Sequence, residues 1–106
     1  MDILGYVRER IKNCDKIELS THAKKRAALR GIEIDQIRNA LEEGELLGVR
    51  DNYNPNVDIE YEEAYIALIT SSSGECYGLP IYFQQRRALI TTVLKLSKPN
   101  LEILEW

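Results

Sequence analysis

Apolar residues recur along the chain with two different periods, and the changes between them divide the sequence into helices and strands. A spacing of three or four residues is typical of one face of an amphipathic helix, whereas alternation is typical of a half-buried strand. The helical pattern predicts helices over 2–13, 21–30 and 34–43. The alternating or extended pattern predicts strands over 16–20, 45–52, 63–70, 76–85 and 88–96.

Residue types that begin and end helices stand at the edges of these predicted elements. Ser20 or Thr21 is expected to cap the start of the second helix, and Gly31 to end it. Gly44 ends the third helix. The segment 53–63 combines acidic residues with asparagines and a proline, and we expect it to be a turn-rich loop.

The strands of the second half are close enough together to form hairpins. Residues 71–74 and 86–87 are the expected connections. Pro80 cannot donate a hydrogen bond to a neighbouring strand, so its strand is expected to lie at a sheet edge or to carry a bulge there. The order of elements predicts one α+β domain, 1–106, with N-terminal helices packed on one face of a small, twisted, mainly antiparallel sheet. The other face is then free to receive a ligand.

Composition excludes several classes of protein. The chain is 44% hydrophobic and 29% charged, which is typical of a globular protein and too apolar for a disordered one. The sequence contains no apolar run of about 18 residues, so no membrane span is predicted. Residues 1–13 do not resemble a signal peptide, so a cytoplasmic location is expected. Cys14 and Cys76 are expected to be free thiols, and the sequence predicts neither a metal nor a cofactor.

Charge is distributed unevenly along this chain, whose net charge is −3. Residues 51–106 have a balance of −4, whereas 20–32 contains four basic residues and no acid. A local basic patch on an acidic protein can hold a phosphate without coating nucleic acid in general. The alternative is an ordinary solvated helix face.

His22, Arg26 and Arg30 follow one another at four-residue intervals, so they share one face of the second predicted helix within about 80°. We call these three residues the basic stripe. Alanines flank the stripe on one side and Leu29 on the other, so its side chains are expected to be at least half enclosed. Enclosed guanidinium groups need either acidic partners or an anionic ligand.

The sequence leaves two roles open for the basic stripe. It forms structural ion pairs, for example to Asp15, Glu18 or an acid of 58–63, or it is a functional anion site. Histidine transfers protons near neutral pH, and arginine binds phosphate oxygens through paired N–H donors. These types of residue suit metal-independent cleavage of RNA.

Further candidates lie on the predicted strands. Tyr82 and Gln84 share one face, where a base could stack or a phosphate could bind, although a half-exposed aromatic and a solvated amide are the simpler interpretation. Arg86 and Arg87 are expected to be turn residues that could also contact an RNA backbone.

The stretch "STHAKKRAALRGIEIDQIRNALEEGELL", together with "YGLPIYFQQRRALITTVLKL", resembles the family called domain of unknown function 4258. The resemblance covers roughly residues 17–96. The hallmark is His-Ala-x-x-Arg-x-x-x-Arg-Gly-Ile, followed by a helix ending in Glu-Gly and by a strand with Ile-Thr-x-Val. Here these positions are His22, Ala23, Arg26, Arg30, Gly31, Ile32, Glu43, Gly44, Ile90, Thr91 and Val93.

That family is similar to the BrnT and RelE groups of toxin ribonucleases. The resemblance implies a compact α+β fold, RNA as substrate, either free or on the ribosome, and a cognate antitoxin as protein partner, with no membrane. The site residues that it implies are His22, Arg26, Arg30, Tyr82 and Thr91. The predicted function is therefore a metal-independent endoribonuclease of a toxin–antitoxin system. The alternatives are a non-catalytic RNA- or protein-binding module on the same fold, and an interaction protein in which the stripe forms buried ion pairs.

Overall fold

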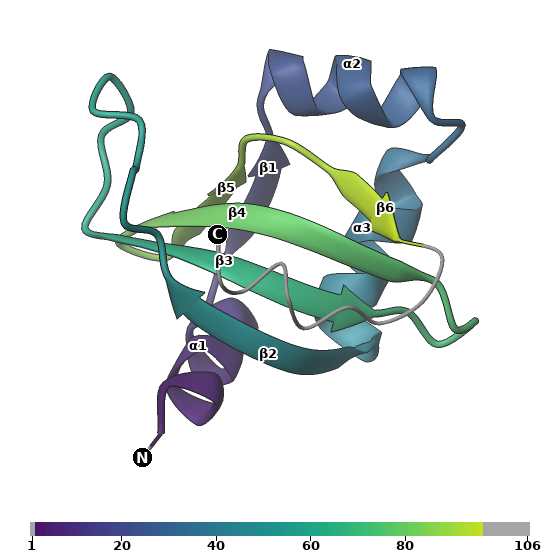
Figure 1. Ribbon diagram of the computed structural model, residues 1–106. Helices are drawn as coiled ribbons and strands as arrows, with labels where there is room; N and C mark the ends of the chain where they lie inside the picture. The colour runs from purple at the N-terminus through teal and green to yellow at the C-terminus, as the bar shows by residue number, and fades with distance from the viewer. Residues whose placement is uncertain (1, 97–106) are drawn as a thin grey trace.

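The computed structural model describes residues 2–96, which adopt an α+β fold (Figure 1). The helices are α1 (Ile3–Lys12), α2 (Thr21–Leu29) and α3 (Ile34–Glu43). The strands are β1 (Lys16–Leu19), β2 (Glu45–Asp51), β3 (Glu63–Thr70), β4 (Cys76–Gln84), β5 (Arg87–Ile90) and β6 (Leu94–Leu96). The predicted elements are present within one residue at each end, except that the last strand is divided into β5 and β6. No helix within 2–96 is long and apolar enough to cross a membrane.

The strands form one sheet in the order β1-β5-β4-β3-β2, and β6 pairs with the other end of β4. Pairing is antiparallel throughout this sheet except between β1 and β5, which run parallel. The prediction of a mainly antiparallel sheet is therefore confirmed. β1 joins the edge beside β5 although the two are distant in the sequence.

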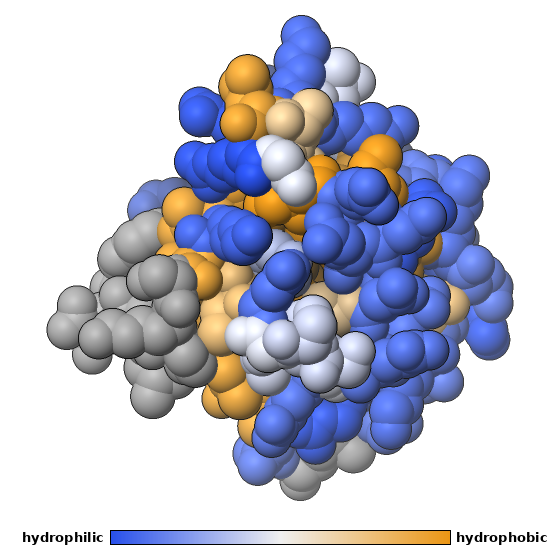
Figure 2. Space-filling model, turned by 90° about the vertical axis from the view of Figure 1, so that its right-hand side faces the viewer, coloured by the Kyte–Doolittle hydropathy of each residue, from blue (hydrophilic) through white to orange (hydrophobic). Residues whose placement is uncertain are grey.

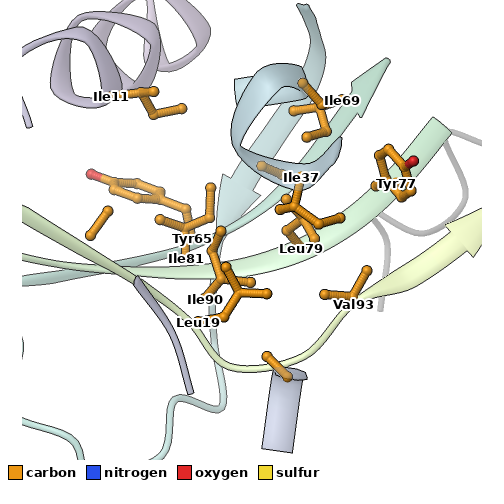
Figure 3. Packing of buried hydrophobic residues seen from close by; sticks show 14 of the residues in the cluster. Ile11, Leu19, Ile37, Tyr65, Ile69, Tyr77, Leu79, Ile81, Ile90 and Val93 are labelled. Atoms are coloured by element: carbon orange, nitrogen blue, oxygen red, sulfur yellow. The ribbon is translucent and has the colours of Figure 1, made fainter. Parts of the chain in front are cut away.

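Helices α1 and α3 cover one face of the sheet, and α2 lies across one end of it (Figure 1). We call the helix-covered side the inner face and the opposite side the outer face. The core lies between the inner face and the helices, where Ile37 of α3 packs beside Leu79 of β4 (Figure 3). Alternate residues of β4 enter this core, as the two-residue period of a strand requires. They are Tyr77, Leu79, Ile81 and Phe83.

Helix α2 begins and ends where the sequence predicts. The Ser20 side chain accepts a hydrogen bond from the Ala23 amide (3.1 Å), which caps the first turn. Gly31 adopts a φ of +68°, a left-handed conformation that favours glycine after a helix end. These two local signals fix the length of α2.

Pro80 lies in the central strand β4, yet the neighbouring strand is interrupted opposite it. β5 ends at Ile90 and β6 begins at Leu94, so 91–93 leave the ladder beside Pro80. The Pro80 carbonyl accepts from the Thr91 amide (3.4 Å), and the nitrogen of a strand residue points to the same side as its carbonyl. The missing N–H therefore faces the interruption. The two predicted alternatives, an edge position or a bulge in this strand, are both wrong, because β4 lies inside the sheet and its register with β3 is continuous through Pro80.

Gly44 connects α3 to β2 where no side chain fits. A Cβ atom at this position would overlap the backbone oxygens of Thr70 and Ala40, neither of which belongs to a flexible side chain. We expect Gly44→Ala to lower the free energy of unfolding by about 1–3 kcal/mol, as overpacking does elsewhere. Urea denaturation measures this change. Asn39→Ala, on the exposed side of α3, is the control, and an equally small effect of both substitutions would contradict the prediction.

Candidate functional site

Helix α2 is held at both ends by the segment that joins β5 to β6. At its start, the Ser20 amide donates to the Ile90 carbonyl (2.9 Å), and the Ser20 hydroxyl donates to the Thr91 carbonyl (3.2 Å). At its end, Arg30 donates from Nη1 to the Val93 carbonyl (2.6 Å). The helix therefore lies alongside 90–93, and Thr91 lies beside its first turn.

The three sides of α2 face different surroundings. Ala23 and Ala27 are buried in the core, and Lys24 and Ala28 line a hollow shared with α3. On a helical projection, Ala23 and Ala27 lie between the basic stripe on one side and Lys24 and Ala28 on the other. Since α3 covers the inner face of the sheet, the stripe lies on the side of α2 toward the outer face.

His22, Arg26 and Arg30 all belong to the exposed residues, so the expectation of an enclosed stripe is not confirmed. The expectation treated Leu29 as part of an apolar border, but its side chain is 81% exposed. The buried face of α2 is thus narrow and consists of the alanines alone. Solvent reaches the whole basic stripe.

Asp15 and Glu18, two of the acids expected to neutralise the stripe, are engaged elsewhere. Asp15 pairs with Arg86 (2.9 Å), and Glu18 pairs with Lys16 (2.8 Å) and Arg87 (3.5 Å). These pairs occupy both arginines of the β4–β5 connection, of which Arg87 belongs to β5 rather than to the turn. Within residues 2–96 no ion pair includes a residue of the basic stripe. The interpretation of the stripe as a buried ion-pair network is therefore wrong for this part of the chain.

The surface around α2 is strongly hydrophilic. Besides the basic stripe, Lys24 and Lys25 are exposed, and no acid occurs between residues 20 and 32. Figure 2 shows the side of the molecule on which α2 ends and α3 begins, where hydrophilic residues cover most of the right and hydrophobic residues show at the top and on the left. The exposed basic residues of α2 can attract an anion.

Tyr82 is not on an open face. The residue is 4% exposed, and its hydroxyl accepts hydrogen bonds from the Asn56 amide (2.8 Å) and from Asn52 Nδ2 (3.4 Å). Its ring packs edge-on against Tyr61 at 5.3 Å between centroids. The segment between β2 and β3 covers the ring, so the prediction that Tyr82 offers a stacking surface is wrong.

A hollow on the outer face, which the sequence did not reveal, lies beside Tyr82. Its volume is about 360 Å³, and we call it the outer hollow. It is lined by Glu18, Ile59, Glu60, Tyr82, Gln84, Arg87, Ala88 and Leu89. Two-residue alternation in β1, β4 and β5 places Glu18, Gln84 and Leu89 on one face, but only the pairing of β1 with β5 brings them together. That pairing leaves no local signal in the sequence.

Fold and site define a small α+β protein with one exposed helix that carries a histidine and two arginines on one side. The chain belongs to the family described as Domain of unknown function (DUF4258), whose model matches residues 19–95. The match includes α2 with the whole basic stripe and leaves α1 outside, and the predicted family is confirmed. No curated protein and no solved structure is significantly similar to the chain.

Proposed function

We propose that this protein is a metal-independent endoribonuclease, the toxin of a toxin–antitoxin pair, and that the basic stripe holds the scissile phosphate. One observation carries the proposal. The single histidine of the chain lies on an exposed helix face with two arginines, and no acid within residues 2–96 neutralises them. The same function is implied by the similarity that we expect between this family and the BrnT and RelE groups of toxin ribonucleases.

Cleavage of RNA without a metal needs few groups. The 2′-hydroxyl attacks the adjacent phosphorus, the bond to the 5′-oxygen breaks, and the products are a 2′,3′-cyclic phosphate and a free 5′-hydroxyl. His22 accepts the proton of the 2′-hydroxyl, and solvent, which reaches this helix, protonates the leaving oxygen. Arg26 and Arg30 stabilise the charge that develops on the phosphate oxygens.

Arg30 is positioned for this role by its own contact. A guanidinium group carries five N–H donors, and the bond to the Val93 carbonyl uses one of them. That bond fixes the plane of the group while the side chain stays exposed. A phosphate can therefore bind without displacing the contact that holds the end of α2.

A non-catalytic RNA- or protein-binding module is the second candidate function. No hydrogen bond within residues 2–96 orients the His22 ring, and Tyr82, another site residue that the resemblance implies, is buried with its hydroxyl bonded by Asn52 and Asn56. A binding module needs neither an oriented imidazole nor a second proton-transfer group. The two candidates thus differ in chemistry and share one surface.

The test is RNA cleavage by the purified full chain, on free RNA in EDTA and on intact bacterial ribosomes in a buffer that contains Mg²⁺, with detection of 2′,3′-cyclic phosphate ends. Cleavage under these conditions supports the nuclease, whereas no cleavage by folded protein in either condition would contradict it.

RNA binding shows whether the basic stripe itself, rather than the positive charge of α2 as a whole, holds the phosphate. We expect Arg26→Ala to weaken RNA binding by about tenfold or more, because a charge-assisted hydrogen bond to phosphate is lost. Lys24→Ala removes the same charge from the α3 side of the helix and is the matched control, for which we expect a smaller change. Fluorescence anisotropy with labelled RNA measures both. Equal weakening by the two substitutions would show that charge alone binds RNA.

A further inference from the structure

The outer hollow lies close to the first turn of α2. Glu18, in its lining, stands two residues before Ser20, and Leu89 stands two residues before Thr91. Ser20 and Thr91 are joined by a hydrogen bond of 3.2 Å. Since a strand advances about 3.3 Å per residue, the hollow begins roughly 7 Å from the start of α2. Both the hollow and the basic stripe lie toward the outer face.

One wall of the outer hollow is rich in hydrogen-bond acceptors. The Gln84 side chain donates from Nε2 to Glu60 Oε1 (3.4 Å), which holds the Glu60 carboxylate beside the hollow. Glu60 is exposed and has further capacity to accept hydrogen bonds. This wall therefore suits a ligand with neighbouring N–H groups.

The remaining walls of the outer hollow are suited to a flat ring. Ile59 and Leu89 are partly buried and give apolar sides. Arg87 also lines the hollow, held by Glu18 at 3.5 Å, and contributes N–H donors of its own. The hollow thus combines apolar walls with acceptors and donors from different strands.

We propose that the outer hollow binds a guanine base of the RNA, next to the phosphate at the basic stripe. Guanine has two adjacent donors, N1–H and the N2 amino group, which match the two oxygens of the exposed Glu60 carboxylate. Its O6 and N7 atoms accept from arginine, a role that Arg87 can fill. Adenine, cytosine and uracil each present an acceptor beside their donor and would leave an acceptor of the hollow unpaired. The proposal rests on RNA being the substrate.

The test is an NMR titration of the full chain with 5′-GMP, 5′-AMP, 5′-CMP and 5′-UMP. We expect 5′-GMP to bind most tightly, and Glu60→Gln and Gln84→Leu each to weaken its binding by about tenfold or more. Asp58→Asn makes the same charge change in the same loop outside the hollow, and it should leave 5′-GMP binding unchanged. Equal binding of the four nucleotides, or no effect of either hollow variant, would overturn the proposal.

Two further readouts test whether the occupant is a base and whether its binding is independent of cleavage. Nα-acetyl-argininamide presents the guanidinium group of a basic protein partner, and tighter binding of this probe than of 5′-GMP would overturn the guanine proposal. Nucleotide binding is measured without cleavage, so a guanine preference in a protein that cuts no RNA supports the hollow and contradicts only the nuclease. Equal cleavage at all four bases would overturn the proposal that the outer hollow binds guanine, and it would leave the nuclease proposal standing.

Discussion

Replacing His22 with alanine is expected to slow RNA cleavage by about 10²–10⁴-fold, the usual contribution of a general acid or base. The melting temperature should not change, because the side chain is exposed and makes no hydrogen bond or ion pair within residues 2–96. RNA binding should change little, since Arg26 and Arg30 still contact the phosphate. Single-turnover cleavage, anisotropy and thermal unfolding measure the three quantities.

Lys25→Ala is the matched control for this experiment. It removes a basic side chain from the same exposed helix outside the basic stripe, and we expect cleavage within about twofold of the unmodified protein. A His22→Ala protein that cuts RNA at the normal rate would refute the assigned proton transfer. A protein that loses cleavage and RNA binding together would show that His22 acts in binding.

Glu63→Ala is expected to cause the largest loss of stability, because one carboxylate fastens α1 to the sheet. Glu63 accepts hydrogen bonds from the hydroxyls of Tyr6 (2.6 Å) and Tyr65 (2.7 Å) and pairs with Arg10 at 3.0 Å. The Arg10 guanidinium also lies over the Phe83 ring, 4.9 Å from its centroid. Removing the carboxylate leaves the two hydroxyls without their partner and leaves Arg10 with the more distant Glu62 (3.8 Å) and the Gln85 carbonyl (2.7 Å). We expect the free energy of unfolding to fall by about 3 kcal/mol.

The effect of Glu63→Ala should depend on pH. Burial raises the pKa of Glu63, but the hydrogen bonds from Tyr6 and Tyr65 and the charge of Arg10 outweigh it and hold the pKa below its ordinary value. A carboxylate with a depressed pKa stabilises the protein above the pKa of the unfolded chain, about 4.3, and this contribution disappears as pH falls through the folded value.

Urea denaturation between pH 7 and pH 3 tests this prediction. The difference between the unmodified protein and Glu63→Ala should be full at pH 7 and should shrink below about pH 4. Glu9→Ala, on an exposed side of α1, is the control and should change stability by less than about 0.5 kcal/mol. A difference that stays constant with pH would mean that packing, rather than charge, accounts for the loss.

The elements of this fold follow from local signals, and the sequence predicts them well. Ser20 caps α2 through its own hydroxyl, and Gly31 ends the helix through a backbone conformation that other residues rarely adopt. Such interactions reach only a few residues along the chain. The pairing of β1 with β5 joins Glu18 to Leu89, and no periodicity within either strand indicates that partner.

The candidate site shows the same division between local and distant effects. The four-residue spacing correctly places His22, Arg26 and Arg30 on one face of α2, because the geometry of a helix is local. Their exposure depends on what packs nearby, and nothing in the sequence showed that Leu29 would face solvent. The burial of Tyr82 likewise depends on the segment 52–62, whose folding back over the sheet is a tertiary event.

Pro80 belongs to β4, yet it bears on how the proposed RNA-binding helix is attached to the sheet. Because it offers no N–H, β5 and β6 do not continue as one strand, and the carbonyls of Thr91 and Val93 remain outside the ladder. Ser20 and Arg30 bind those same two carbonyls. The absence of the Pro80 N–H in the middle of the sheet thus leaves two carbonyls at its end that attach the helix. The basic stripe is mounted on a rigid support, and binding RNA need not first order the helix.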